Sequence, residues 1–530
     1  MLASIRAAAL VGIEAVPVTV EVHTGRGLPN WIITGLPDGA VRESRERVSA
    51  AIEQAGFEVP SRRIVVNLSP ADLRKVGTGF DLPIALALLA ATDQLAPESL
   101  APLIAIGELG LDGAVRAVRG VLPVARLAAS CGATLVLPHA TRAEGALVPG
   151  CAMHPVHALR PLVEALRRGR LAVEHDGDGV ADAGTSSDDD TPDDLADVIG
   201  QPAAVRALVI AAAGHHNLAM CGPPGAGKTM LARRLPGLLP PLDDAARLEV
   251  VAVHSVAGVL DAARLRSRRR PFRAPHHTTS VAGLVGGGSG PRPGEVSLAH
   301  HGVLFLDELP HLASHALEAL REPIEDRVVH IARAGGALRF PSDVLLVVAM
   351  NPCPCGQAGH PTLPCRCAPA ALARYAQRLS GPLADRIDLH VDVAPVPLAT
   401  LAEGSARPAA AGSSTAVWRE RVAAARDRQL ERQGVANARV AAARLLDPAS
   451  CAPDARTFLA DAAARLALSA RGFHRTLRVA RTIADLADAP RIERVAVAEA
   501  LRYRRRLDAA TPAALPAGLM QTGVPAGPLS

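Results

Sequence analysis

Aromatic side chains are scarce in this chain of 530 residues. Phenylalanine, tryptophan and tyrosine make up only 2% of it, while hydrophobic residues as a whole reach 49%. We therefore expect helix-rich domains with aliphatic cores. The scarcity also argues against the stacking of bases on aromatic rings as the main way to bind a nucleic acid.

Long apolar runs and a strong charge of one sign are also missing. No stretch approaches the ~18 uncharged apolar residues of a membrane span. The apolar start of the chain is interrupted by Glu14, and residues 16–22 alternate as in a β-strand rather than an export signal. These features predict a cytoplasmic protein with no membrane partner. The net charge of +5 is too weak to decide for or against a nucleic-acid partner.

The cysteine pattern does not resemble a disulfide framework. Four of the eight cysteines, at positions 131, 151, 221 and 451, are isolated, as expected for thiols in a reducing compartment. The other four form two C-x-C pairs within residues 352–368, namely Cys353, Cys355, Cys365 and Cys367. Four thiolates at this spacing predict a closed, structural zinc site. A redox-sensitive disulfide pair is the alternative.

An acidic, glycine-containing stretch divides the chain. Residues 173–194 contain few large apolar groups and are predicted to form a solvated linker. The length predicts about three or four domains. Shifts in composition place an α/β domain at 1–172, a nucleotide-binding α/β domain at 195–397 and a helical domain at 398–510. Residues 511–530 are expected to be a frayed tail.

A complete GxxxxGK[ST] motif lies at residues 222–229. It consists of Gly222, Pro223, Pro224, Gly225, Ala226, Gly227, Lys228 and Thr229. A helix and a buried strand are predicted before it and a helix after it, which is the context that the motif requires. Its backbone N–H groups are expected to surround the phosphates of ATP, with Lys228 on the β- and γ-phosphates and Thr229 on Mg²⁺.

Two acids follow another apolar run. Residues 303–306 end at Asp307 and Glu308, as expected for a central parallel strand that opens at the nucleotide. We expect Asp307 to hold Mg²⁺ and Glu308 to polarise the attacking water, although such acids can also lie in a solvated loop. The apolar run 344–350 ends at Asn351, which would help to place that water unless it is only a turn residue.

Two arginines complete the predicted hydrolytic site. Arg386 stands where ring ATPases supply an arginine to the neighbouring subunit, with a local salt bridge to Asp385 or Asp388 as the alternative. Arg475 resembles the second sensor of an ATPase lid, with Arg478 in reserve.

Longer segments resemble one family. Residues 272–278 (FRAPHHT), 286–300, 351–356 (NPCPCG) and 480–486 (ARTIADL) are similar to the YifB/ComM group of magnesium-chelatase-like AAA+ proteins, nearly end to end. The resemblance implies an AAA+ P-loop domain with a helical lid, assembled as a homo-hexamer. It also implies ATP-driven branch migration on branched or single-stranded DNA during natural transformation, with recombination proteins as possible partners.

The same resemblance implies two β-hairpin inserts, at about residues 283–298 and 328–341. The second carries Arg333 and Arg339, which would either grip DNA phosphates in a ring channel or only flank a solvated loop. The rival interpretation is a chaperone like the magnesium chelatase motor subunit or the MoxR proteins, acting on a protein partner.

The first domain resembles the proteolytic domain of Lon in residues 106–120 and 135–138. A serine–lysine peptidase needs a nucleophile and a basic amine together. Phe80 and Asp81 stand where the serine region falls, and residues 121–123 contain no lysine. We therefore expect a Lon-like fold without peptidase chemistry, as in the similar domain of the RadA repair protein.

Overall fold

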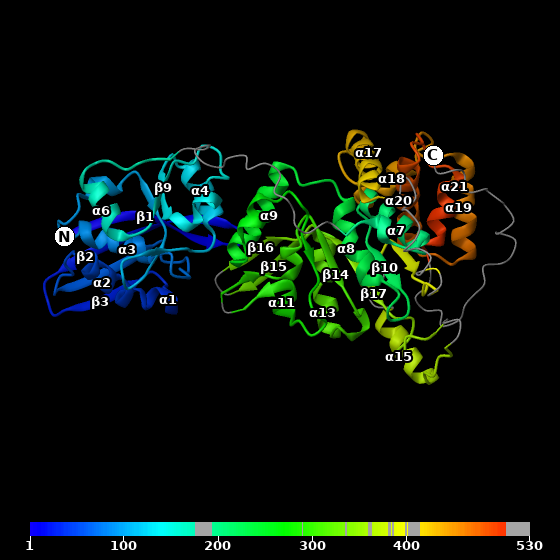
Figure 1. The fold of residues 1–530 in the computed structure, drawn as a ribbon, viewed down its shortest axis with the longest axis horizontal. Coiled ribbons are helices and arrows are strands. Elements are labelled where there is room, and N and C mark those ends of the chain that lie inside the picture. Colours follow the sequence, from blue (N-terminus) through cyan, green and yellow to red (C-terminus); the bar gives the residue numbers. More distant parts are fainter. Residues whose placement is uncertain are drawn as a thin grey trace.

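The structure is a computed structural model, and three consecutive parts of the chain follow one another along its long axis (Figure 1). The predicted tail 511–530 and most of the predicted linker lie outside the described residues. The described residues are 1–174, 193–288, 290–333, 336–358, 363–379, 383, 386–397, 400 and 414–504.

The N-terminal part is built on a seven-stranded mixed sheet in the order β3-β4-β2-β1-β5-β8-β9. Its longest strands, β1 (Leu2–Val11) and β2 (Glu14–Gly25), form an antiparallel hairpin with alternately buried side chains. The strand expected at 16–22 is thus part of β2, whereas the apolar start of the chain forms a strand that the sequence did not predict. The remaining strands are β3 (Asn30–Thr34), β4 (Arg63–Ser69), β5 (Leu103–Ala105), β8 (Thr134–Pro138) and β9 (Met153–Val156).

Helix α3 (Asp81–Ala90) forms the centre of this domain, because all ten of its residues are buried. Its first residue, Asp81, accepts two hydrogen bonds from the Arg47 guanidinium, at 2.7 and 2.9 Å. Burial raises the pKa of the Asp81 carboxyl, although Arg47 opposes the shift. A buried ion pair therefore occupies the region where a Lon peptidase would place its serine. The other main helices are α2 (Ser44–Gln54), α4 (Val121–Ser130) and α6 (Leu159–Arg167).

The middle part is a three-layer α/β/α domain around a parallel sheet in the order β11-β14-β17-β10-β18. Helices α7 and α8 and the lid pack on one face, and α11, α12 and α13 pack on the other. Because all strands are parallel, their carboxyl ends lie at one edge, where ligands bind in such sheets. The strands are β10 (Leu218–Cys221), β11 (Phe272–Arg273), β14 (Val303–Leu306), β17 (Leu345–Met350) and β18 (Leu389–Asp392). The helices are α7 (Pro202–Gly214), α8 (Lys228–Leu238), α9 (Asp244–Ala257), α11 (Val281–Val285), α12 (Glu295–Leu298), α13 (Ser314–Ala319), α14 (Arg321–Asp326) and α15 (Pro369–Leu379).

Two antiparallel hairpins project from this domain. The first pairs β12 (Gly286–Gly287) with β13 (Arg292–Pro293), and the second pairs β15 (Val328–Arg333) with β16 (Gly336–Pro341). Both lie inside the ranges expected from the family resemblance.

The C-terminal part is a helical lid whose core is continuous with that of α7 and α8. Its helices are α17 (Thr415–Gln433), α18 (Ala442–Leu445), α19 (Pro453–Arg465), α20 (Ala470–Leu486) and α21 (Arg494–Arg502). The segment 480–486 is structural: buried Asp485 accepts hydrogen bonds from Arg481, Arg432 and Asn437, each at 2.7–2.8 Å. This network fixes α20 against α17. No helix in the described part of the chain has the length and apolar character that a membrane span requires.

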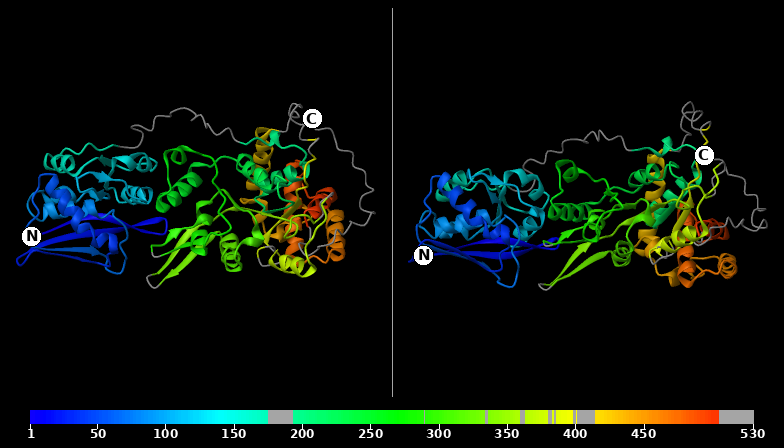
Figure 2. Two further views of the ribbon diagram at one scale, coloured as in Figure 1. Left: turned by 60° about the horizontal axis from the view of Figure 1, so that its bottom comes forward. Right: turned by 90° about the horizontal axis from the view of Figure 1, so that it is seen from below.

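The N-terminal domain contacts the middle domain through α4 and through the β1–β2 hairpin, among the described residues. Helix α4 packs on α9, where the N–H of Gly120 donates to the carbonyl of Ser255 at 3.3 Å. The turn of the β1–β2 hairpin reaches the second insert hairpin, as Figure 2 shows. A Cβ atom on Gly12 would lie 2.7 Å from the carbonyl oxygen of Arg339, so only glycine fits this contact. The N-terminal domain therefore touches the element that carries the predicted DNA-binding arginines.

Candidate nucleotide and metal sites

The GxxxxGK[ST] motif forms the loop from β10 to α8, at the carboxyl edge of the parallel sheet. A Cβ atom on Gly222 would lie 2.2 Å from the carbonyl of Val393, so the loop can pass the end of β18 only as glycine. Gly227 precedes α8 with a φ of 89°, a conformation that favours glycine. The N–H groups at the start of α8 are thus available to bind phosphate.

Lys228 is buried at the base of this loop. Its ammonium donates to the carbonyls of Gly222 and Pro223, at 2.7 and 2.9 Å, and to Oδ1 of Asn351 at 3.2 Å. Burial lowers its pKa, and the nearby carboxylate of Asp307 opposes the shift. The predicted phosphate-binding lysine and the predicted sensor are therefore in direct contact. Lys228 follows β10 and Asn351 follows the neighbouring strand β17.

Thr229 and Asp307 also meet, and their oxygens fit a magnesium site. The Thr229 hydroxyl donates to Oδ2 of Asp307 at 2.9 Å. Two adjacent oxygen ligands of an octahedral Mg²⁺ ion lie about 3 Å apart, given metal–oxygen distances of about 2.1 Å. The other Asp307 oxygen accepts the N–H of Glu308 at 2.8 Å, which holds the carboxylate in place. When bound, Mg²⁺ would neutralise phosphate charge beside these residues.

Arg386 and Arg475 lie elsewhere. Arg475 donates to the carbonyl of Ile387 at 3.3 Å, just before β18 begins. Since β18 runs parallel to β10, this is the amino edge of the sheet, about 13 Å from the phosphate loop for a four-residue strand. The buried Arg386 forms an ion pair with Glu325 at 2.5 Å and lowers the pKa of that carboxyl. Neither arginine is brought to the phosphate loop of its own chain.

The four clustered cysteines converge as a zinc site requires. The Sγ atoms of Cys353 and Cys355 are 3.3 Å apart, and each is 3.6 Å from that of Cys365. The Cys367 sulfur completes a group whose members all lie within 4.8 Å of one another. Sulfur atoms around a tetrahedral zinc ion lie roughly 3.8 Å apart, whereas a disulfide needs about 2.05 Å. The donor set therefore fits zinc better than a disulfide.

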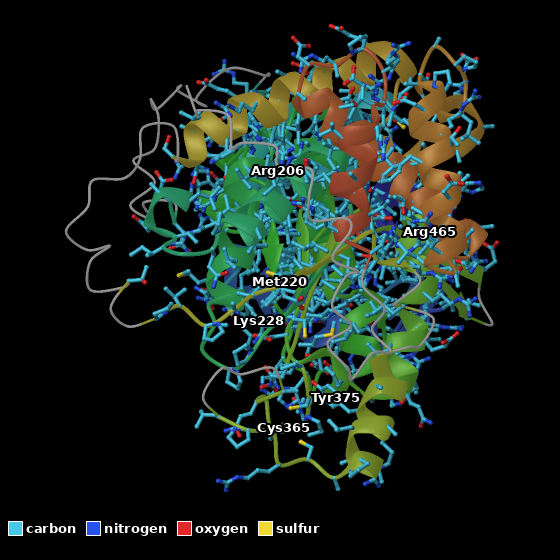
Figure 3. The ribbon with its side chains drawn as sticks, turned by 90° about the vertical axis from the view of Figure 1, so that its right-hand side faces the viewer. Arg206, Met220, Lys228, Cys365, Tyr375 and Arg465 are labelled. Atoms are coloured by element: carbon cyan, nitrogen blue, oxygen red, sulfur yellow. The ribbon has the colours of Figure 1, made fainter. Side chains whose placement is uncertain are left out.

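The cysteine loop lies against the phosphate loop. A Cβ atom on Gly356 would lie 2.5 Å from Cδ of Pro224, so the two loops are in close contact. On the other side, the Tyr375 hydroxyl of α15 donates to the carbonyl of Asn351 at 2.9 Å. Lys228, Tyr375 and Cys365 all lie in the lower half of the view in Figure 3. The cysteine loop thus connects to both loops that would meet the nucleotide.

Three sequence profiles match successive parts of the chain. "Magnesium chelatase, subunit ChlI" matches residues 194–401, "Subunit ChlI of Mg-chelatase" matches 20–141, and "Magnesium chelatase, subunit ChlI C-terminal" matches 412–504. Protein YifB of Salmonella typhimurium is 41% identical over 507 residues, which cover 95% of this chain and 97% of YifB. Competence protein ComM of Haemophilus influenzae is 41% identical over 505 residues, covering 95% of this chain and 97% of ComM. The chain belongs to the YifB/ComM family of magnesium-chelatase-like AAA+ proteins.

A shorter similarity connects this YifB/ComM protein to Lon protease 2 of Bacillus subtilis, with 31% identity over 155 residues, or 27% of each chain. Family membership confirms the predicted fold class, an α/β protein with a Lon-like first domain, an AAA+ P-loop domain and a helical lid. It also supports binding of ATP at the phosphate loop.

Sequence reasoning missed three contacts in this YifB/ComM protein. Glu325, which pairs with Arg386, and Tyr375, which holds the Asn351 backbone, carry no signal in the sequence. His277 does, because it lies in the segment FRAPHHT that helped to identify the family; its Nδ1 is 3.4 Å from Oε2 of Glu308. Of the predicted DNA-binding residues, Arg339 is exposed on β16, and the side chain of Arg333 lies outside the described part.

Proposed function

We propose that this protein is an ATP-hydrolysing motor that assembles as a homo-hexameric ring and remodels DNA. The observation that carries the hydrolytic part is the meeting of Lys228, Thr229, Asp307 and Asn351 at one edge of the sheet. Lys228 would bind the β- and γ-phosphates, and Thr229 and Asp307 would hold Mg²⁺. Glu308 would polarise the attacking water, with Asn351 helping to place it.

A ring gives Arg386 and Arg475 a role, since both lie at the sheet edge opposite the phosphate loop. We propose that both act in trans, on ATP bound by the neighbouring subunit. An arginine supplied in this way contributes about 10³-fold or more to phosphoryl transfer. Arg386 would have to exchange its Glu325 partner for the phosphate when the ring forms. Arg478 remains the reserve, although its guanidinium donates to the carbonyl of Val440 in the lid.

The proposed nucleic-acid surface is formed by the two hairpins and the domain beside them. Arg339 is exposed on the second hairpin, and Arg292 is exposed on the first. Burial, and next the like charge of Arg292, lower the pKa of Arg119 in the N-terminal domain. Among the described residues neither Arg119 nor Arg292 has a carboxylate partner. Arginines that have no carboxylate partner and lie on adjoining elements are suited to bind the phosphates of DNA. Such contacts do not depend on the base sequence.

Within this proposal the protein acts in the cytoplasm, as a branch-migration helicase in recombination during natural transformation. The relationship to Competence protein ComM supports that role, and recombination proteins would be its partners. The cysteine loop would hold structural zinc. The second candidate is a chaperone that remodels a protein partner, which the match to magnesium chelatase profiles favours.

Junction migration separates the two functions. The purified protein is expected to bind single-stranded and four-way-junction DNA, to show DNA-stimulated ATPase activity and to move the junction with ATP. The Arg333→Ala/Arg339→Ala variant should no longer move the junction. Its DNA affinity should also depend less on salt: the slope of log affinity against log salt concentration should become less steep by about one unit for each lost phosphate contact. The control variant changes two exposed lid arginines, Arg419→Ala/Arg465→Ala. A wild-type protein that hydrolyses ATP but neither binds DNA at low salt nor moves the junction would favour the chaperone.

A further inference from the structure

Asp343 lies between the second hairpin and the strand that ends at the predicted sensor, two residues after β16 and two before β17. Its half-buried carboxylate meets side chains from four other parts of the chain. His215 at the end of α7 lies 3.4 Å away, and His301, just before β14, lies 3.7 Å away. Arg327, which follows α14 and precedes β15, lies 3.7 Å away, and Arg439 of the lid forms the closest pair.

Three of these four partners have a left-handed backbone. The φ angle is 59° at His215, 56° at His301 and 59° at Arg327. Only eight non-glycine residues in the described part of the chain have a positive φ, so three of the eight converge on one carboxylate. Such a conformation persists only where surrounding contacts hold it, and it is concentrated at functional sites. The position of the Asp343 carboxylate is therefore tightly determined.

The charged partners of this carboxylate at neutral pH are the two arginines. Burial lowers the pKa of His215 to about 4 and also lowers that of His301, so both imidazoles are neutral. Burial alone would raise the pKa of Asp343, but its hydrogen-bonding and charged partners hold that pKa well below its usual range. An ionised carboxylate is thus shared by Arg327 at the hairpin and Arg439 in the lid.

Asp343 is firmly joined to the base of the second hairpin through its neighbour Ser342. The Ser342 N–H donates to the carbonyl of Arg327 at 2.8 Å, and its hydroxyl donates to the carbonyl of Pro323 at 3.1 Å. Ser342 is fully buried, and the pairing of β15 with β16 starts directly beyond this closure. A displacement of the carboxylate would therefore turn the hairpin about its base.

Arg439 is equally well fixed in the lid. It ends a short 3₁₀ helix, Asn437–Arg439, that α20 holds by two contacts. Asn437 donates to the Asp485 carboxylate at 2.7 Å, and Arg478 donates to the carbonyl that follows the 3₁₀ helix at 2.9 Å. Helix α20 also carries the lid arginine that is proposed to act in trans. The ion pair between Asp343 and Arg439 therefore joins this helix to the base of the hairpin.

We propose that Asp343 is a positioning residue that couples the lid to the second hairpin through its ion pair with Arg439. Helix α8 begins at the phosphate loop and shares one core with the lid, so a nucleotide at that loop can reach Arg439 through packed helices. The hairpin then changes position with the nucleotide state. The consequence for DNA rests on the proposed function, whereas the coupling itself requires only that the chain binds nucleotide.

Hydrogen–deuterium exchange of the full chain, with and without a non-hydrolysable ATP analogue, tests this coupling. In the parent, the analogue should change the exchange of the β15 and β16 amides about fivefold, the size of a typical coupling between two sites. Arg439→Gln should lose this change, while its helix α20 still responds to the analogue. Arg439→Lys, which keeps the charge, should restore it. Arg444→Gln, which changes an exposed arginine of α18, is the matched control.

A pair that only stabilises the fold predicts a different result. If the analogue changes hairpin exchange in Arg439→Gln as much as in the parent, or leaves it unchanged in the parent, the coupling is wrong. Asp343→Asn keeps the side-chain shape without the charge and should behave like Arg439→Gln. A parental response in Asp343→Asn would equally overturn the coupling, and this variant decides the question if Arg439→Gln does not fold.

Junction migration tests the consequence for DNA separately. Arg439→Gln should keep its basal ATPase activity but no longer move a four-way junction. If the wild type neither binds DNA nor moves the junction, the motor function fails, and the exchange experiment still decides whether Asp343 couples the lid to the hairpin.

Discussion

The ammonium of Lys228 donates a hydrogen bond to Oδ1 of Asn351 across 3.2 Å, joining the phosphate loop to the end of β17. The predicted sensor and the predicted phosphate-binding lysine are therefore in direct contact. A nucleotide that draws Lys228 onto its phosphates would also change the partner of Asn351.

The first prediction concerns Lys228 and Glu308. Lys228→Ala should lose nucleotide binding, because the amine meets the charge of the β- and γ-phosphates. Glu308→Gln should bind ATP normally but hydrolyse it at least 10²-fold more slowly, since a positioned base contributes roughly that much to the rate. Binding of a fluorescent ATP analogue and steady-state phosphate release measure the two effects. Wild-type hydrolysis by Glu308→Gln would show that another group polarises the water.

The second prediction concerns Arg386 and Arg475. Arg386→Ala and Arg475→Ala should each be inactive alone, yet regain turnover when mixed with Lys228→Ala. In such a mixed ring the Lys228→Ala subunits supply intact arginines to the intact nucleotide pockets of the arginine variants. The mixture of Arg386→Ala with Arg475→Ala should stay inactive, because no subunit then offers both groups. Lys228→Ala mixed with Glu308→Gln is the control, since neither has an intact pocket. Absence of recovery in rings shown to be mixed would place the arginines in a local, structural role.

The third prediction is one zinc ion per subunit, measured by elemental analysis. Cys353→Ser/Cys365→Ser should lose the metal, and Cys131→Ser, an exposed thiol outside the cluster, should keep it. Loss should also lower ATPase activity several-fold, because Gly356 of the cysteine loop lies against Pro224 of the phosphate loop. Equal metal content in the double variant and the parent would exclude the site.

The fourth prediction concerns acid stability. Burial lowers the pKa of His215, His254 and His390 to about 4. Histidine in an unfolded chain has a pKa of about 6.5, so below that pH the unfolded state binds protons that the folded state does not. The free energy of unfolding should therefore fall between pH 6.5 and 4, by up to about 1.4 kcal/mol per pH unit for each histidine. Urea unfolding at pH 7, 6 and 5 checks this.

The variant His254→Gln tests a single contribution to that slope. A glutamine amide can replace the hydrogen bond of His254 to the carbonyl of Leu298, at 2.9 Å in the parent, without titrating. The variant should lose stability less steeply below pH 6.5. An identical slope in variant and parent would show that His254 is protonated in the folded state.

Local sequence was enough to predict the chemistry of the phosphate loop. The residues from Gly222 to Thr229 specify a turn and a helix start, and four apolar residues before Asp307 specify a buried strand. These signals come from residues that are close together in the sequence, so they can be recognised without knowledge of the fold. The cysteine cluster was predicted for the same reason, whereas the hairpin at 328–341 was expected from the family resemblance. The functional roles of these residues remain predictions.

Strand β1 was missed because its reason for forming is not local. Its alanine-rich sequence has little preference for strand, and it forms one by pairing along its whole length with β2. The pairing of Asp81 with Arg47 is likewise decided by packing, since 34 residues separate them.

The sequence by itself determined the phosphate-loop motif, the two acids that follow an apolar run, and the family, since each shows as a pattern along the chain. Only the tertiary structure decided which side of the sheet each residue occupies. It put Arg386 and Arg475 at the amino edge, His277 beside Glu308, and Gly12 against Arg339. These relationships depend on strand order and on contacts between domains, which bring together groups that are distant in sequence and leave no local pattern to read.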